Sequence, residues 1–521
     1  MITRRNLLCT SGALLATSLA GCATTPALVE NTGASDDVVA LPAGKIRGSI
    51  RNGIRIFRNV PFGANPYTPE RRFRHSVPPE PWTGVRDCTK PGAIPLQPDR
   101  NGPGMIGGGD ALVLNLWAPA DGKNLPVMVW IPGGGSTNCD NNDPRFDGTR
   151  FAEDGVVLVT LNYRVNVDGF LKLEDGDANC GLSDMILGLK WVHDNIALFG
   201  GDPNRVTVFG QSAGGTHTTS LIASPKTKGL FSQAIIQSPS AVAQWRNEAD
   251  ARKAAKRLAD FLGVPPTRAG FASLTNDELV AFKKLVGQLS KDPDWSLFAQ
   301  GNTALFKPYV EHDILHDRPV DAIRAGAAAG IRVISGCTKE EWRNYVVPSG
   351  AIDRIGYDAV KMLAASLGLP SSIAEDYRAA GHGRTTGEVF TRMQGDLIFR
   401  MPCNRLLESL AISSTPVWAY SFEWESPVTG KTGQKRGAAH SSDVSFVFDT
   451  IAAPTAVKIN GADAPQALAD AMHGAWVRFA KTGDPGWEPF DLERRATRRF
   501  ADEVSTVLDP WAFERKTLIV P

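Results

Sequence analysis

The chain contains 521 residues, of which 42% are hydrophobic and 21% are charged. This composition is typical of a soluble globular protein, and it excludes a disordered chain and a multi-pass membrane protein. Lysine and arginine number 56 and aspartate and glutamate 55, so the formal net charge is +1. No nucleic-acid partner is expected, because proteins that bind nucleic acids normally carry a basic field.

Residues 1–22 have the pattern of an export signal. A basic segment with the pair Arg4-Arg5 precedes a short apolar stretch over residues 7–20, too short for a spanning helix of about 20 apolar residues. The arginine pair resembles a twin-arginine signal. Leu19-Ala20-Gly21-Cys22 resembles a lipobox, which predicts cleavage before Cys22 and lipidation of that cysteine. A plain signal peptide cut nearby is the alternative.

Residues 23–37 are polar and rich in turn formers, which predicts a flexible tether. The chain is therefore expected to be exported, either to the periplasm or to a membrane surface where lipid on Cys22 anchors it. Five cysteines remain beyond the signal, an odd number without C-x-x-C spacing, so neither a disulfide framework nor a zinc site is predicted. These are Cys88, Cys139, Cys180, Cys337 and Cys403.

Residues 38–521 are expected to form a single domain, because no linker divides them. Two alternating runs, 45–50 and 54–57, flank Asn52-Gly53 and predict a hairpin with a type I′ turn. Residues 61–104 are dense in proline and glycine and are expected to be mostly loop.

Further along the chain, short apolar runs alternate with helical patterns. Helices are expected at 182–196 and 466–481, the second as a C-terminal helix, and residues 245–325 and 350–412 predict helical insertions. Strands that alternate with helices predict an α/β fold, with a mostly parallel central sheet covered by helices on both faces. The expected strands cover residues 112–117, 127–131, 156–161, 206–209, 333–335 and 417–422.

One motif points to the chemistry. Gly210-Gln211-Ser212-Ala213-Gly214 follows the strand at 206–209 and precedes a plausible helix. G-x-S-x-G in this setting is typical of a nucleophile elbow, in which small residues allow a tight turn that projects the serine hydroxyl above the sheet. The pentapeptide also occurs by chance in ordinary glycine turns, so its surroundings have to decide.

Acyl transfer by a serine also needs donors for an oxyanion. Gly133-Gly134-Gly135 follows the strand at 127–131, and successive glycines let backbone N–H groups face a reacting carbonyl. With the N–H of Ala213 they would complete an oxyanion hole. A loop that is glycine-rich only for flexibility is the weaker alternative.

The base is expected to be His440, which follows a glycine-containing loop after a strand. On such a fold the order along the chain is serine, acid, histidine, which excludes His75 and His193. His217 lies about one turn beyond the elbow on the same helix, so it is not expected to reach back. The acid should follow a strand between Ser212 and His440.

Two further pairs leave alternatives open. Glu340 and Glu341 both follow the predicted strand at 333–335 and suit the acid, and at least one of them is expected to be a solvated carboxylate at a helix start. His312 and His316 have i, i+4 spacing that could bind a metal, but their charged, proline-containing surroundings favour a surface turn. No metal is predicted.

Over nearly all of residues 38–521 the chain resembles type-B carboxylesterases, the α/β-hydrolase group that includes acetylcholinesterase, bile-salt lipase and bacterial para-nitrobenzyl esterases. The resemblance depends on the elbow and on the motifs that lead up to it. These are Asn162-Tyr163-Arg164-Val165, Asn179-Cys180-Gly181-Leu182-Ser183-Asp184, Trp191-Val192-His193-Asp194-Asn195-Ile196 and Phe199-Gly200-Gly201-Asp202-Pro203.

The resemblance implies roles for individual residues. It makes Ser212 the nucleophile, His440 the base and Glu341 the acid, since Gly336…Glu340-Glu341 matches the family pattern G-x-x-x-[DE]-E. It also implies an ion pair between Arg164 and Asp184 that is structural. The oxyanion donors would be Gly134, Gly135 and Ala213, and the residues around the triad Ser238, Asp443 and Gln211.

The chain departs from the family at several positions. Gln211 stands where the family usually has glutamate, which removes a negative charge and makes selectivity for cationic substrates unexpected. Pro132 replaces a common histidine and Ser136 an aromatic residue, so the acyl pocket is expected to differ. An early disulfide of the family is missing, because Pro95 and Ala111 stand about where its cysteines would be.

We therefore predict an exported serine carboxylesterase that acts on a small-molecule ester. It should need no metal or organic cofactor, and it should meet a membrane only through lipid on Cys22. Two alternatives remain at this point. One is a hydrolase of amide, carbamate or thioester bonds with the same triad, and the other is a non-catalytic binding homologue of the kind that neuroligins represent.

Overall fold

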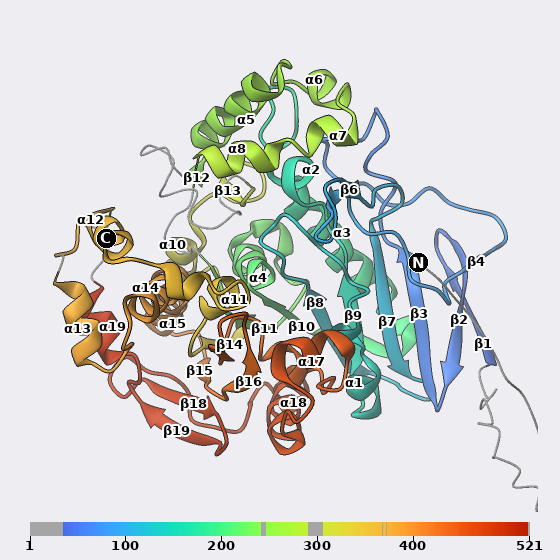
Figure 1. Cartoon of the computed structure of the whole chain (residues 1–521). Helices are drawn as coiled ribbons and strands as arrows, with labels where there is room; N and C mark the ends of the chain where they lie inside the picture. Colours follow the sequence, from blue (N-terminus) through green and yellow to red (C-terminus); the bar gives the residue numbers. More distant parts are fainter. Residues whose placement is uncertain (1–34, 241–245, 290–305, 367, 371, 519–521) are drawn as a thin grey trace, which may run out of the picture.

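The computed structural model describes residues 35–240, 246–289, 306–366, 368–370 and 372–518 (Figure 1). The predicted signal, Cys22 and tether residues 23–34 lie outside these ranges. The predicted tether is wrong at its end, because strand β1 already begins at Ser35 and pairs with strand β2 (Gly44–Arg51). Regular pairing from Ser35 with Ile50 to Leu41 with Gly44 makes residues 35–37 part of the edge strand of the sheet.

A large twisted sheet runs through the molecule (Figure 1). In spatial order, its middle strands, from β9 (Val157–Leu161) to β18 (Ala496–Phe500), pair in parallel, whereas both edges are antiparallel. The predicted α/β class with a mostly parallel sheet is confirmed. In spatial order after β1 and β2 the strands are β3 (Ile54–Pro61), β7 (Val113–Pro119), β9 (Val157–Leu161), β8 (Leu125–Ile131), β10 (Gly201–Gln211), β11 (Gln233–Gln237), β14 (Arg332–Thr338), β15 (Val417–Phe422), β18 (Ala496–Phe500) and β19 (Ser505–Leu508), with β4 (Val85–Asp87) beside β2.

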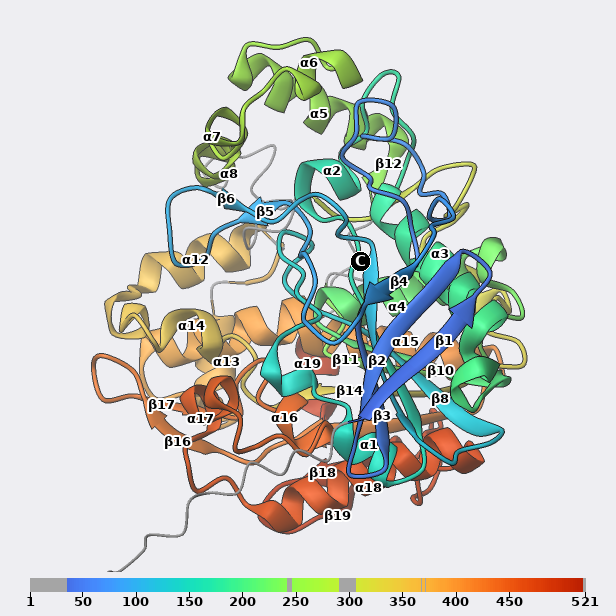
Figure 2. The ribbon, with the colours of Figure 1, turned by 90° about the vertical axis from the view of Figure 1, so that its right-hand side faces the viewer.

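The predicted N-terminal hairpin is confirmed. Strands β2 and β3 pair antiparallel around Asn52 and Gly53, whose φ angles of 51° and 77° suit a type I′ turn. Figure 2 shows these strands at the near edge of the sheet. The following segment, predicted to be mostly loop, contains β4 and part of a two-stranded ribbon of β5 (Gln97–Pro98) and β6 (Met105–Ile106).

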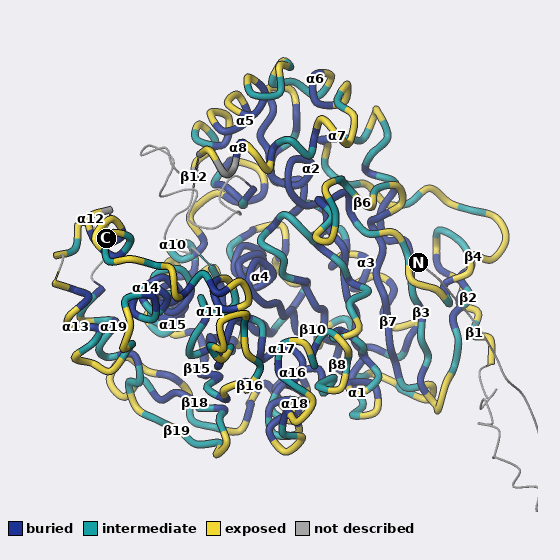
Figure 3. The backbone as a smooth tube through the Cα atoms, viewed as in Figure 1, coloured by how far each residue is buried: buried dark blue, intermediate teal, exposed yellow. Residues whose placement is uncertain are grey.

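The core has two layers, one on each face of the sheet. Alternation along β8 sends Val127, Val129 and Ile131 into one hydrophobic cluster and Met128 and Trp130 into the other. Both faces are therefore buried, as Figure 3 shows for the central strands. The first cluster includes apolar side chains of α3 (Cys180–Asn195) and α4 (Ala213–Ala223), and the second those of α1 (Thr149–Glu153) and α18 (Gln466–Thr482).

Both regions predicted as insertions are mainly helical in their described parts, and the first also contains the paired short strands β12 (Arg246–Asn247) and β13 (Tyr309–Val310). One group of helices lies at the top of Figure 1 and the other at its left. The predicted helix at 466–481 exists as α18, but it is not the last element, because β18, β19 and α19 (Ala512–Thr517) follow it. The inserted helices include α5 (Glu248–Leu262), α6 (Arg268–Ala272), α7 (Asn276–Leu279), α8 (Phe282–Leu289), α12 (Tyr357–Ser366), α13 (Ile373–Ala379), α14 (Thr386–Gly395) and α15 (Met401–Ile412).

The five cysteines of the globular region are free, and each is buried. Within the described ranges, no helix combines the length and the apolar character needed to cross a membrane.

Candidate active site

The register of the parallel strands brings the predicted site together. Gly210 of β10 pairs with Ile131 of β8, so the elbow and the glycine loop begin side by side. On the other flank, Gln211 pairs with Gln237 of β11, and Gln237 pairs with Gly336 of β14. Four chain segments therefore leave the sheet at one edge, which is where α/β folds generally place their ligands.

Ser212 occupies the tight turn between β10 and α4. Its φ of 61° and ψ of −125° place a non-glycine residue in a strained region of backbone space. The turn requires glycine around it, because a Cβ on Gly214 would lie 2.0 Å from the carbonyl oxygen of Ile131. A Cβ on Gly210 would lie 2.6 Å from the Gly214 backbone. These contacts explain why the motif needs glycine on both sides of the serine.

Glu341 and His440 meet through a hydrogen bond between Oε2 of the carboxylate and Nδ1 of the imidazole. The other carboxylate oxygen accepts from the Ser238 hydroxyl at 2.6 Å and from the backbone N–H of Thr338 at 2.7 Å. Glu341 is 1% exposed. The buried carboxylate is thus fully engaged, and its remaining oxygen is directed at the ring.

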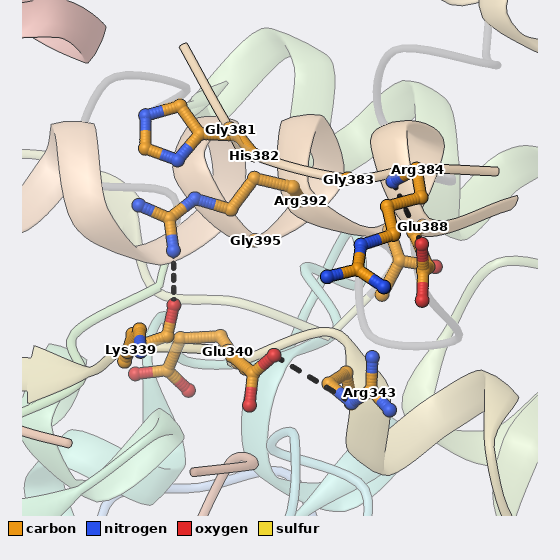
Figure 4. Close-up of a pocket in the computed structure, with 12 residues that line it drawn as sticks. Lys339, Glu340, Arg343, Gly381, His382, Gly383, Arg384, Glu388, Arg392 and Gly395 are labelled. Atoms are coloured by element: carbon orange, nitrogen blue, oxygen red, sulfur yellow. Dashed lines mark hydrogen bonds and ion pairs between the residues drawn. The ribbon is translucent and has the colours of Figure 1, made fainter. Parts of the chain in front are cut away.

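Glu340, the neighbouring candidate, contacts a different set of groups. Its carboxylate accepts from the N–H of Ala438 at 3.1 Å and lies 3.8 Å from Nε of Arg343. Figure 4 shows it lining a second cavity of about 320 Å³ with Arg343 and Arg392. Of the two glutamates, only Glu341 bonds to His440.

Ser212 and His440 line one cavity of about 380 Å³, together with the glycine loop. The imidazole also meets Gln211, whose Nε2 lies 3.2 Å from Nε2 of His440. Ser441 fixes the other end of this amide by donating to its Oε1 at 3.0 Å. Among the described residues the hydrogen bonds of His440 reach Glu341 and Gln211 but not Ser212. Such contacts are often loose before substrate binds and tighten in the complex.

The glycine loop is a defined turn. Its φ angles of 135° at Gly134 and 67° at Gly135 favour glycine, and a Cβ on Gly134 would lie 2.1 Å from the carbonyl oxygen of Asn138. The N–H groups of Gly134 and Gly135 have no acceptor among the described residues. Ala213 opens α4, where an N–H group lacks an intrahelical acceptor. Three backbone donors are therefore available near the serine.

Of Ser238 and Asp443, only Ser238 hydrogen-bonds to Glu341 in the described part of the chain. The Asp443 carboxylate accepts from Nε2 of Gln237 at 2.9 Å and from the Tyr420 hydroxyl at 3.0 Å. Burial raises the pKa of Asp443 to about 6, and the charge of Glu341 adds to this effect, which the two hydrogen bonds oppose.

The sequence did not predict several neighbours of His440 and Ser212. The ring of Phe399 packs at 4.4 Å from the His440 ring and that of Tyr345 at 5.8 Å, measured between centroids. Gln237 accepts the Ser212 N–H at 2.9 Å through its carbonyl. No local pattern marks these residues, because only the packing of distant segments makes them neighbours.

Two other features that the sequence raised are an ion pair and a possible metal site. Arg164 and Asp184 form a fully buried ion pair at 2.7 Å that joins the segment after β9 to α3. No group of three or more histidine, cysteine or acidic side chains in the described part of the chain is arranged to hold a metal.

Comparisons with known proteins extend over nearly the whole chain. The family described as "Carboxylesterase family" matches residues 35–508. Para-nitrobenzyl esterase from Bacillus subtilis is 31% identical over 504 residues, which cover 92% of this chain and 98% of that protein. Phenmedipham hydrolase from Pseudarthrobacter oxydans is 31% identical over 89% of this chain and 95% of its own length. The crystal structure of the Geobacillus stearothermophilus carboxylesterase Est55 has a TM-score of 0.80 at 32% identity, covering 92% of this chain and 99% of that one.

Proposed function

Because this chain belongs to the carboxylesterase family and is a carboxylic ester hydrolase, we propose that it works through an acyl-enzyme formed on Ser212. The Ser212 hydroxyl attacks the ester carbonyl, and His440 takes its proton. The alcohol then leaves with that proton. A water molecule, deprotonated by the same imidazole, releases the acid and restores the serine.

The observation that carries this proposal is the bond between Glu341 and His440. When Nδ1–H donates to Glu341, the lone pair of the imidazole is on Nε2, where it can accept the serine proton. The carboxylate also stabilises the imidazolium that follows. Glu341 can do so because Ser238 and Thr338 hold its other oxygen.

The oxyanion that forms on the carbonyl needs donors that are already in place. We assign them to the N–H groups of Gly134, Gly135 and Ala213, which come from two segments and have no acceptor among the residues that the structure describes. Fixed backbone dipoles of this kind stabilise charge as it develops, because they need no reorganisation during the reaction.

Gln211 has a part in the first step. Its amide nitrogen lies 3.2 Å from Nε2 and 3.4 Å from Nδ1 of His440, so it lies beside the ring nitrogen that is to accept the proton, and the Ser212 hydroxyl has to take its place there. A rotation about the serine side chain that accompanies substrate binding would make this exchange, and Ser441 would keep the released amide in position.

The test is the reaction of Ser212→Ala with 4-nitrophenyl acetate and with a fluorophosphonate probe. We expect kcat/KM to fall by several orders of magnitude and labelling to be lost. Ser349→Ala, at an exposed serine outside the cavity, is the matched control and should retain both. Labelling that persists in Ser212→Ala would reject the assignment of the nucleophile.

We also propose that the chain is exported through residues 1–22 and anchored by lipid on Cys22. The basic and apolar halves of this segment and the lipobox-like end support the proposal. Mass spectrometry of the mature N-terminus tests it, and a lipidated Cys22 is expected. An unmodified N-terminus at another residue would contradict the lipid anchor and would indicate export by a plain signal peptide.

A further inference from the structure

The cavity beside Ser212 has a positively charged wall. Its lining includes Arg100 and Arg145, and among the residues that the structure describes no aspartate or glutamate lines it. The other polar side chains around it are mainly neutral amides and hydroxyls. At the position where the family usually carries glutamate, Gln211 contributes an amide instead of a carboxylate.

The two arginines differ in how their charge is balanced. Arg145 forms an ion pair with Asp143, in which Nη2 lies 2.7 Å from Oδ2, and its Nε also donates to this carboxylate. Arg100 is exposed, and its guanidinium has no hydrogen bond or ion pair within the described ranges. The nearby acids are engaged, since Asp143 holds Arg145 and Asp140 accepts the N–H of Asn142 at 2.8 Å. Arg100 therefore presents to the cavity a guanidinium that no described carboxylate pairs with directly, although Asp143 and Asp140 lie near enough to act on its charge.

Arg100 lies beside the glycine loop, where the reacting carbonyl of the substrate is expected to bind. An ideal Cβ on Gly134 would lie 3.2 Å from Nη2 of Arg100, and one on Gly133 would lie 3.2 Å from Cβ of Ser212. The guanidinium and the nucleophile thus flank neighbouring residues of one loop. A substrate bound with its carbonyl at this loop would bring groups a few bonds away within reach of Arg100.

We propose that this cavity selects esters that carry a carboxylate or another anionic group, and that Arg100 binds this group. The inference rests on the proposed function of Ser212. Arginine suits the role because its planar guanidinium donates two parallel hydrogen bonds to a carboxylate. The wall of the cavity assists because it carries no negative charge that would repel an anion.

The experiment compares matched substrates in the full-length protein. One pair is monoethyl adipate and its neutral amide, ethyl adipamate, with the charge in the acid part. The other is 4-acetoxybutanoate and 4-acetoxybutanamide, with the charge in the alcohol part. The readout is the ratio of kcat/KM for the anion to kcat/KM for the amide, measured at low and at high salt.

For the wild type we expect a ratio above one in at least one pair, and that pair shows which side of the ester faces Arg100. Arg100→Gln should lower the ratio about tenfold, the size expected for a charged hydrogen bond near solvent. Arg100→Lys should restore part of it. High salt should lower the wild-type ratio, because salt screens exposed charges. Arg47→Gln, on strand β2 at the edge of the sheet, is the control and should keep the wild-type ratio.

A ratio near one in both pairs, or a ratio that Arg100→Gln does not change, would overturn this inference. That result would leave the proposed function intact as long as cleavage of the ester bond in the two neutral, amide-bearing substrates depends on Ser212. If Ser212→Ala still cleaved these ester bonds, the proposed function would fail instead.

Discussion

The Ser136 hydroxyl lies 3.2 Å from Nε2 of His217, and this contact ties the glycine loop to the helix that begins after the nucleophile. His217 stacks on Phe170 with an interplanar angle of 7° and meets Tyr163 edge-on. The Tyr163 hydroxyl donates to the carbonyl of Pro132 at 2.7 Å. One aromatic cluster therefore holds the loop at both ends.

The polar pair replaces an aromatic residue that the resemblance led us to expect at position 136. Ser136 has a φ of 57° and is buried, and its carbonyl accepts the N–H of Asn166 at 2.6 Å. Burial lowers the pKa of His217 to about 3, so its ring is neutral in the folded protein at ordinary pH. His217 thus supports the loop, through the contact of its ring with the Ser136 hydroxyl.

Ser136→Ala removes the hydroxyl that joins this loop to His217. We expect kcat to fall several-fold while KM changes little, because the oxyanion donors act mainly on the transition state. Inhibition by a trifluoromethyl ketone, which forms an oxyanion on the enzyme, should weaken in parallel. Ser220→Ala removes a buried hydroxyl from α4, the helix that carries His217. Among the described residues this hydroxyl bonds only within the helix, so the variant should leave both kcat and inhibition by the ketone unchanged. An equal loss in both variants would mean that the effect is general destabilisation.

Glu341→Gln and Glu340→Gln form a matched pair of neighbouring changes. The first replaces the carboxylate that bonds to His440, so the tautomer and the imidazolium lose their support. We expect kcat for 4-nitrophenyl acetate to fall by about 10³-fold or more. The second changes a carboxylate that accepts from Ala438 and faces Arg343, and an amide oxygen can still accept there, so kcat should change by less than about fivefold. The reverse order would reassign the acid.

Asp443→Asn should change how stability depends on pH. Burial raises the pKa of Asp443 from 3.8 to about 6, so between these values the folded protein keeps a proton that the unfolded chain releases. The stability that this group contributes is therefore fully present below about pH 4 and is lost as pH rises through 6, a change of about 3 kcal/mol. An asparagine carries no such penalty.

We therefore expect the unfolding temperature of Asp443→Asn, relative to the wild type, to be higher at pH 8 than at pH 4.5. The Asn oxygen can still accept from Gln237 and Tyr420, so these two hydrogen bonds need not be lost. Thermal unfolding followed by circular dichroism at the two pH values measures the difference. The same difference at both values would contradict a raised pKa.

Much of the site could be recognised locally. Part of the glycine requirement is short-range, because a Cβ on Gly134 would meet the Asn138 carbonyl and one on Gly210 the Gly214 backbone. The contact of Gly214 with Ile131 of β8, by contrast, depends on the sheet. The Asn52-Gly53 hairpin and the buried strands follow from turn chemistry and from the period of apolar residues. Position along the chain, by contrast, left Glu340 and Glu341 equally suitable, and only the family resemblance favoured Glu341 as the acid.

By itself, the sequence determined the class of fold and predicted Ser212 as the nucleophile and His440 as the base, because strand patterns, tight turns and chain order are local or one-dimensional properties. Tertiary structure alone decided that β1 begins at Ser35 and that Glu341 and not its neighbour bonds to His440. It also decided that Arg100 lies beside the glycine loop with no hydrogen-bond or ion-pair partner in the described part of the chain. Those relationships join residues far apart in the chain. They depend on how strands register and helices pack, which no short stretch of residues encodes.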